Sequence, residues 1–161
     1  MLKVSFKDDF KKVQTFNNKA TVVNLTGTVK IPNELYAIIP NNIDEWVFHH
    51  PSVEVVDSLV RGWTLKTAGT SVCAEGDSFN PVTGERIAEA RAKLKIYKFM
   101  CALCSKLLYH YYTILYGNAK ISKISESHSQ PPKDCIYRTY KKYMSLVTKE
   151  VQHLDKLLEE T

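Results

Sequence analysis

The feature that most constrains the fold is a change of period in the middle of the chain. From residue 87 to residue 115, apolar and aromatic residues recur at alternating steps of three and four positions. The series is Ile87, Ala90, Leu94, Tyr97, Cys101, Cys104, Leu108, Tyr111 and Leu115. Because this spacing places one stripe on one face of an α-helix, we expect a helix over residues 84–116. It would be about 45–50 Å long at 1.5 Å per residue.

A second helix with a similar stripe follows. Gly117 and Asn118 favour an end to the first helix, because glycine adopts the left-handed conformation that ends many helices. Residues 117–132 contain four Ser and two Pro, which indicates a flexible connection before a helix over residues 133–160. Its apolar face consists of Ile136, Tyr140, Tyr143, Val147, Val151, Leu154 and Leu158. The two helices can form an antiparallel hairpin within one chain or pair with other copies.

The first half of the chain is rich in β-branched residues and alternates as strands do. We expect strands over residues 20–31, 53–60 and 63–73, with residues 1–6 as a candidate edge strand. Arg61 and Gly62 mark the turn between the last two strands. The segment between Pro32 and Pro40 favours either a short helical turn or an extended crossing.

The two halves together predict an α+β fold, in which a small antiparallel β-sheet packs on a long helix and a helical hairpin or coiled-coil-like extension follows. We place the sheet and the first part of the long helix in residues 1–100, and the hairpin extension in residues 101–161. A small sheet cannot cover a helix of this length, so we expect the hairpin to contact another protein or another copy of the chain. The candidate partner-binding residues are Leu108, Tyr109, Tyr111, Tyr112, Leu115 and Tyr116.

The charge of the chain is unevenly distributed. The net charge is +5, but residues 85–149 hold 13 Lys and Arg against 4 Asp and Glu, whereas residues 150–161 hold 1 against 4. A basic helical stripe can contact phosphates without reading base sequence, which makes sequence-independent nucleic-acid binding the alternative function. Its candidate residues are Arg86, Arg91, Lys93, Lys95, Lys98, Lys141 and Lys142. Lysine-rich helices are also common as simply solvated surfaces.

The junction before the long helix is a candidate structural turn, formed by Asp77, Asn80, Pro81 and Gly84. Either Asn80 caps the helix and Pro81 is its first residue, or residues 81–84 form a turn and the helix begins at Glu85. In both cases, carboxylates near the positive end of the helix dipole repel a bound phosphate. Because glycine lowers helix stability, we expect the backbone of a strand or of a partner to pack closely against Gly84.

Several kinds of chemistry find no support in the residues. Cys101 and Cys104 have the spacing of half a zinc site, but no second pair of ligands accompanies them, so we expect no metal and no cofactor. No phosphate-binding glycine loop, nucleophile elbow or pair of catalytic carboxylates is present, so we expect no enzymatic activity. The first ten residues have no signal-peptide pattern, and Lys106 and His110 interrupt the most apolar segment. The expected locations are therefore the cytoplasm or, for a phage protein, the host cytoplasm or the virion.

The segment "TAGTSVCAEGDSFNPVTGERIAEARAKLKIYK", residues 67–98, resembles small proteins of tailed phages and prophages. In those proteins a sheet precedes an acidic "EDxFDPxxG"-like turn and an "IAxARAxxKxY"-like helix. The matching residues here are Glu75, Asp77, Phe79, Pro81, Gly84, Ile87, Ala88, Ala90, Arg91, Ala92 and Lys95. Gly76 and Ser78 interrupt the acidic part of the pattern.

This resemblance implies a phage-type protein without enzymatic activity, either a virion component or an accessory factor that binds other proteins. It implies no catalytic residue, and it leaves the chain after Tyr109 without a counterpart. The order of sheet and helix also resembles a double-stranded-RNA-binding-type unit, in fold alone.

Overall fold

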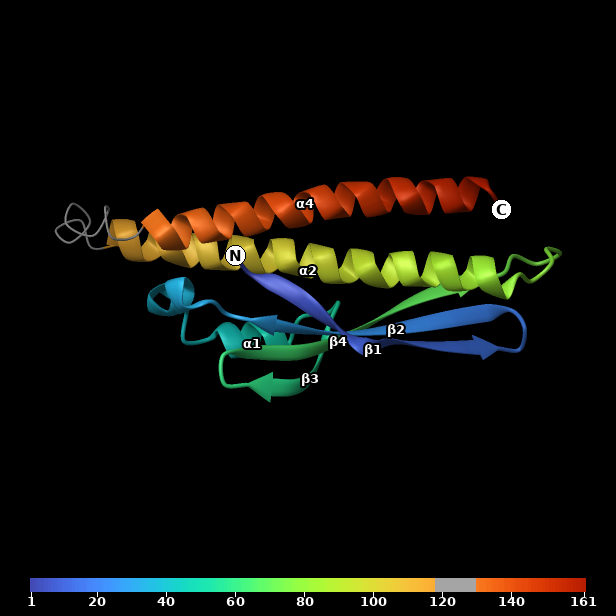
Figure 1. Cartoon of the computed structure of the whole chain (residues 1–161), viewed down its shortest axis with the longest axis horizontal. Helices are drawn as coiled ribbons and strands as arrows, with labels where there is room; N and C mark the ends of the chain where they lie inside the picture. Colours follow the sequence, from blue (N-terminus) through green and yellow to red (C-terminus); the bar gives the residue numbers. More distant parts are fainter. Residues whose placement is uncertain (118–129) are drawn as a thin grey trace.

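Four strands form one antiparallel sheet, and two long helices lie above it (Figure 1). The computed structural model describes residues 1–117 and 130–161, without the side chains of residues 7–10, 116, 117 and 130. The strands are β1 Lys3–Phe16, β2 Ala20–Lys30, β3 Glu54–Leu59 and β4 Gly62–Val72. The helices are η1 Asn33–Ile38, α1 Ile43–Phe48, α2 Pro81–Gly117 and α4 Gln130–Glu159. The predicted α+β class, with its antiparallel sheet and helical hairpin, is confirmed.

The centre of the sheet is the pair β2 and β4. These strands pair antiparallel along their whole length, from Ala20 opposite Val72 to Lys30 opposite Gly62, and the spatial order is β1-β2-β4-β3. Every second residue of β2 is buried, because one face of the sheet meets α2 while the other faces solvent. β3 pairs with β4 only from Gly62 to Lys66, so the second half of β4 has no strand beyond it among the described residues.

The edge strand β1 is longer than the six residues that the sequence predicts. Its register with β2 shifts between Phe6 and Lys11, and pairing then continues to Phe16. Asn17 and Asn18 form the hairpin turn with φ values of 50° and 52°, as a type I′ turn requires. The register shift breaks the alternation of side chains, which is why the pattern of residues did not show the second half of this strand.

Helix α2 is buried on two faces. Toward the sheet, Ala88 and Ala92 pack with Val23 and Leu25 of β2. Toward α4, Ile87 and Ala90 pack with Leu154 and Leu157. The predicted helix over residues 84–116 is therefore present, and it begins three residues earlier. No helix in the described parts of the chain is long and apolar enough to cross a membrane.

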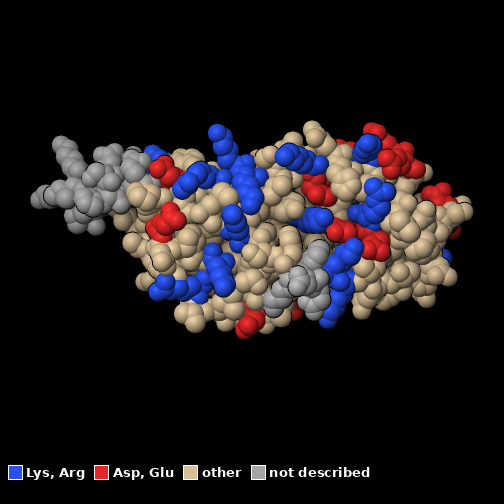
Figure 2. Space-filling view, in the orientation of Figure 1, with Lys and Arg blue, Asp and Glu red and all other residues tan. Residues whose placement is uncertain are grey.

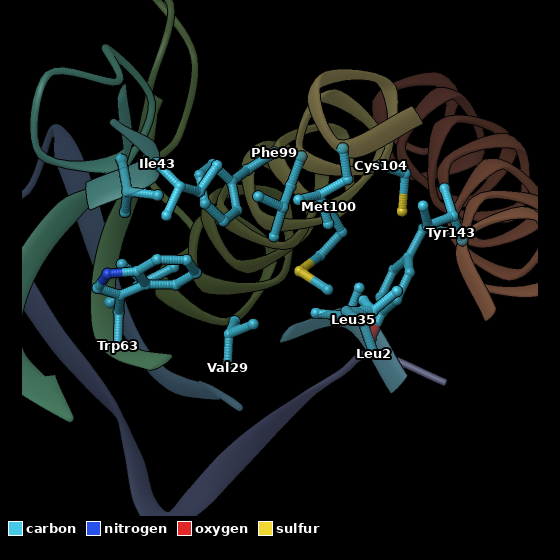
Figure 3. Packing of buried hydrophobic residues seen from close by; sticks show 14 of the residues in the cluster. Leu2, Val29, Leu35, Ile43, Trp63, Phe99, Met100, Cys104 and Tyr143 are labelled. Atoms are coloured by element: carbon cyan, nitrogen blue, oxygen red, sulfur yellow. The ribbon is translucent and has the colours of Figure 1, made fainter. Parts of the chain in front are cut away.

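The main hydrophobic core lies beneath the second half of α2 and includes residues from nearly every element. Figure 3 shows part of it, with labelled side chains Leu2, Val29, Leu35, Ile43, Trp63, Phe99, Met100, Cys104 and Tyr143. Leu35 comes from η1 and Ile43 from α1, so the 32–53 segment supplies a partner that the sequence analysis had not assigned to this part of the helix. The predicted division at residue 100 falls inside this shared core.

Helix α4 packs along α2 in antiparallel direction and reaches the start of β1 (Figure 1). The backbone N–H of Leu2 donates to Thr139 Oγ1 at 3.0 Å, and the N–H of Val4 donates to the Tyr143 hydroxyl at 2.8 Å. These two side chains therefore occupy the outer edge of β1, which would otherwise be an open strand edge.

The predicted apolar face of α4 needs a correction. Ile136 and Tyr143 are buried as expected, but Tyr140, Val151 and Leu158 are 38–42% exposed. The buried face instead contains Cys135, Ile136, Thr139, Tyr143 and Leu157. Thr139 is fully buried because its hydroxyl both accepts from Leu2 and donates to the Cys135 carbonyl, a pairing that hydrophobic spacing cannot indicate.

The predicted connection, residues 117–132, lies largely outside the described residues. The helices reach Gly117 on one side and begin at Gln130 on the other, and residues 118–129 are not described. Pro131 and Pro132 lie in the first turn of α4, where a missing N–H costs no helical hydrogen bond.

The contact between α2 and the sheet is closest at Gly69 of β4. A Cβ atom at this position would lie 1.9 Å from the Ala88 carbonyl oxygen and 2.5 Å from the Ala92 nitrogen. Both are backbone atoms of the helix, so no side-chain adjustment can make room. The absence of a side chain at residue 69 thus sets the distance between α2 and the sheet.

We predict that Gly69→Ala lowers the free energy of unfolding by about 1–3 kcal/mol, because α2 and β4 must move apart to make room for the methyl group. The measurement is urea denaturation followed by circular dichroism. Ser58→Ala is the control, since it changes an exposed side chain of β3 and leaves the contact between α2 and the sheet unaltered. Equal midpoints for the two variants would show that the packing at Gly69 is not as close as described.

Candidate functional site

The junction before α2 is built as a helix cap. Asn80 Oδ1 accepts the backbone N–H groups of Val82 and Thr83 at 3.0 and 3.2 Å, and Pro81 is the first helical residue. Of the two helix starts considered from the sequence, the structure has the one capped by Asn80. The cap satisfies orphan donors that a bound phosphate would otherwise use.

Gly84 faces a strand, as expected, but the contact is with a side chain and not with a backbone. A Cβ atom at Gly84 would lie 2.9 Å from Thr21 Oγ1 of β2. A shallow hollow beside the junction is lined by Cys73, Asp77 and Arg91, among others. Its one described guanidinium, that of Arg91, already donates to a main-chain carbonyl, so the hollow offers a phosphate little attraction.

Two residues of the predicted basic stripe close the open edge of β4. Arg91 Nη1 donates to the Thr70 carbonyl at 2.6 Å, and Lys95 Nζ donates to the Ala68 carbonyl at 2.7 Å. Both acceptors lie in the half of β4 that β3 does not reach. The spacing of four residues along α2 matches the spacing of two along the strand, so successive turns of the helix reach alternate carbonyls. Charged side chains at a strand edge hinder pairing with another chain.

The other predicted nucleic-acid-binding residues do not form one continuous patch. Lys93 pairs with Glu89 at 3.2 Å, and Lys142 lies 5.3 Å from the centre of the Tyr143 ring. Arg86, Lys98 and Lys141 are exposed at separate places on the two helices. Figure 2 shows Lys and Arg side chains spread over one face of the molecule, with Asp and Glu between them.

We predict that Arg91→Met together with Lys95→Met lowers the free energy of unfolding by about 1–3 kcal/mol, because two hydrogen bonds are lost while the aliphatic stems remain. The freed edge of β4 should also promote aggregation, which light scattering measures at increasing concentration. Lys98→Met is the matched control, because it removes a neighbouring charge without uncovering a carbonyl. If the control aggregates as strongly, loss of charge and not the open edge is the cause.

The predicted partner-binding residues of α2 mostly serve the chain's own hairpin. Tyr111 is 3% exposed, and Leu108, Tyr112 and Leu115 pack against the main core. The hydroxyl groups of Tyr112 and Tyr137 are 3.1 Å apart and join α2 to α4. Tyr109 is 74% exposed and remains accessible, while the side chain of Tyr116 lies outside the described ones.

A continuous row of partly exposed apolar residues runs along α4, and the predicted apolar face of this helix contained five of its seven members but not Tyr137 and Met144. These residues follow one another at steps of 3, 4, 3, 4, 3 and 4 positions, and none of them is fully buried. They are Tyr137, Tyr140, Met144, Val147, Val151, Leu154 and Leu158, and we call them the α4 stripe. Five members are 38–43% exposed. The regular spacing was visible in the sequence, but spacing alone does not tell which of two apolar faces meets the rest of the chain.

The thiols are not arranged for nucleophilic chemistry. Burial, together with the neighbouring thiols of Cys101 and Cys135, raises the pKa of Cys104 to about 12. Burial also raises the pKa of Cys101. Both groups are therefore protonated at neutral pH and act as small apolar side chains. Within residues 1–117 and 130–161, no group of three or more His, Cys, Asp and Glu side chains is placed to hold a metal ion.

His50 is a half-buried histidine that packs between aromatic rings. Its ring centre lies 5.2 Å from that of Trp46 and 5.0 Å from that of Phe99. Its Nδ1 accepts the backbone N–H of Ser52 at 3.2 Å, which requires an unprotonated nitrogen. Burial lowers the pKa of His50 below its ordinary value of 6.5. The environment thus favours the neutral ring.

We predict that His50 makes the fold less stable as the pH falls. The unfolded chain binds a proton near pH 6.5 and the folded chain only at lower pH, so the free energy of unfolding decreases through this interval. The measurement is urea denaturation at pH 7.5 and at pH 5, comparing the wild type with His50→Phe and with His49→Phe at the exposed neighbour. His50→Phe should flatten the pH dependence, and His49→Phe should not; equal slopes in all three proteins would contradict the assignment.

Comparison of the chain with models of protein families, with curated proteins and with solved structures found no match.

Proposed function

We propose that this protein acts without enzymatic activity, by binding another protein chain through its helical hairpin, with the α4 stripe as the contact surface. The observation that carries the proposal is the regular spacing of seven partly exposed apolar residues over six turns of α4. Such a row, when it is covered by another helix, forms the seam of a coiled-coil-like contact.

The composition of the α4 stripe supports this role. Tyr137, Tyr140 and Met144 form one end, and Tyr and Met are residue types enriched at protein interfaces. Tyrosine supplies apolar area with a polar tip, and methionine adapts to irregular partner surfaces. The opposite face of α4 is already occupied by α2, η1 and the start of β1. Within the stripe, Leu154 also packs against α2 and the Tyr137 hydroxyl contacts that of Tyr112, so the other members form the side of the helix that a partner can approach.

The biological setting of the proposal comes from the resemblance of residues 67–98 to proteins of tailed phages and prophages. In that setting the protein is a virion component or an accessory factor in the host cytoplasm. The resembling segment forms the end of β4, the capped junction and the first half of α2.

Sequence-independent nucleic-acid binding is the second candidate. It is favoured by the basic half of α4, where Arg138 and Lys141 lie close in sequence to the exposed rings of Tyr137 and Tyr140. Cations and stacking rings together are typical of surfaces that bind single strands. This candidate has less support, because Arg91 and Lys95 are engaged by carbonyls and Lys93 by Glu89.

We predict that a photo-crosslinking amino acid at Met144 yields protein adducts of discrete mass in cells that express the full chain. The control position is Val56 of β3, an apolar residue that is 55% exposed on the sheet. Gel electrophoresis and mass spectrometry identify the adducts, and nuclease treatment detects attached nucleic acid.

Equal protein adducts at both positions would contradict the proposal, because the α4 stripe would then be no more than ordinary surface. Nuclease-sensitive adducts at Met144 would instead favour the second candidate. In that case Arg138→Glu with Lys141→Glu should abolish them, because these charges would hold the phosphates.

A further inference from the structure

The charges of α4 are separated along the helix. Residues 133–149 carry five Lys and Arg and only one acidic residue, Asp134, whereas residues 150–160 carry four acidic residues and only one Lys. This order is opposite to the one that the helix dipole favours, which places acidic residues first and basic residues last. This order of charges is unfavourable for an isolated helix, so we expect a neighbouring segment of complementary charge to stabilise it.

Helix α2 supplies such a neighbour for only one end of α4. Its basic first half runs beside the acidic end, where Ile87 and Ala90 contact Leu157. Its second half, residues 99–115, contains Lys106 and no acidic residue, so it supplies no carboxylate to pair with the basic end of α4. None of the ion pairs in the described part of the chain involves a Lys or Arg of α4, and the pair within this helix joins His153 to Glu150 at its acidic end.

Two exposed charges beside the α4 stripe are arranged symmetrically. Lys141 and Asp155 are two heptads apart, so both lie on the same side of the helix, next to the stripe. The midpoint of this pair is Thr148. A helix with this pattern is complementary to a copy of itself that runs in the opposite direction.

We infer that the partner of the α4 stripe is a second copy of this chain, with its α4 antiparallel to the first and a two-fold axis near Thr148. In this arrangement Lys141 lies opposite the copy's Asp155. The same register sets Tyr140 against Leu158, Met144 against Leu154 and Val147 against Val151 of the copy. A parallel arrangement would place like charges at the same level, which is destabilising. This inference rests on the proposed function and specifies its partner.

The arrangement is isologous, because each copy presents the same surface to the other. The two hairpins together form a four-helix layer in which the α4 helices are central.

The inference is tested by the mass of the full chain in solution and by single-cysteine crosslinking. Light scattering should give twice the chain mass of 18.4 kDa. In a Cys73→Ser/Cys101→Ala background, Thr148→Cys should be joined to its copy by a short bismaleimide. Lys141→Cys should not, because the two copies of residue 141 lie about 21 Å apart along the antiparallel helices at 1.5 Å per residue.

Charge exchange gives a second test that does not alter the apolar stripe. Lys141→Glu should weaken the dimer, and adding Asp155→Lys should restore it, with circular dichroism showing that every variant is folded. A dimer unaffected by the first exchange, or equal crosslinking at residues 148 and 141, would overturn the antiparallel pairing.

The outcomes separate this inference from the proposed function. A monomeric wild type that still gives adducts with a different protein at Met144 would overturn the inference and leave the proposed function standing. A monomer without specific adducts at Met144 would overturn both.

Discussion

The rest of the structure depends on the close packing of α2 against β2 and β4. Gly69 lets the helix backbone approach the strand directly, and Ala88 and Ala92 keep the facing side of the helix small. Because α2 lies this near to the sheet, its opposite face can hold α4, and its flank brings Arg91 and Lys95 over the edge of β4. Helix α2 thus packs on the sheet, packs on α4 and covers part of the edge of β4.

Side chains from the helices cover parts of two open strand edges. At the second half of β4 the donors are the two cations of α2, and at the start of β1 the acceptors are Thr139 and Tyr143 of α4. Arg91 and Lys95, two residues of the predicted basic stripe, therefore have a structural role at the edge of β4.

What remains for a partner is the α4 stripe, with its flanking charges. The apolar residues define where a helix could lie, and the order of the charges defines its direction. These two properties are independent, since the stripe is set by spacing and the charges lie outside it. The stripe permits several antiparallel registers, and the pair Lys141 and Asp155 selects the one with an axis near Thr148.

The sequence by itself determined the order and period of the elements. Alternation in residues 20–31 and 63–73, the heptad spacing of residues 87–115 and the pair Asn80 and Pro81 each reflect local geometry, and local geometry is encoded by neighbouring residues. It did not show the second half of β1, where a register shift breaks the alternation, or the buried Thr139, whose partner is 137 residues away. Only the tertiary structure decided which face of α4 is covered and which basic residues are engaged, because several faces of the helices carry apolar or charged residues, and contacts between distant segments select among them.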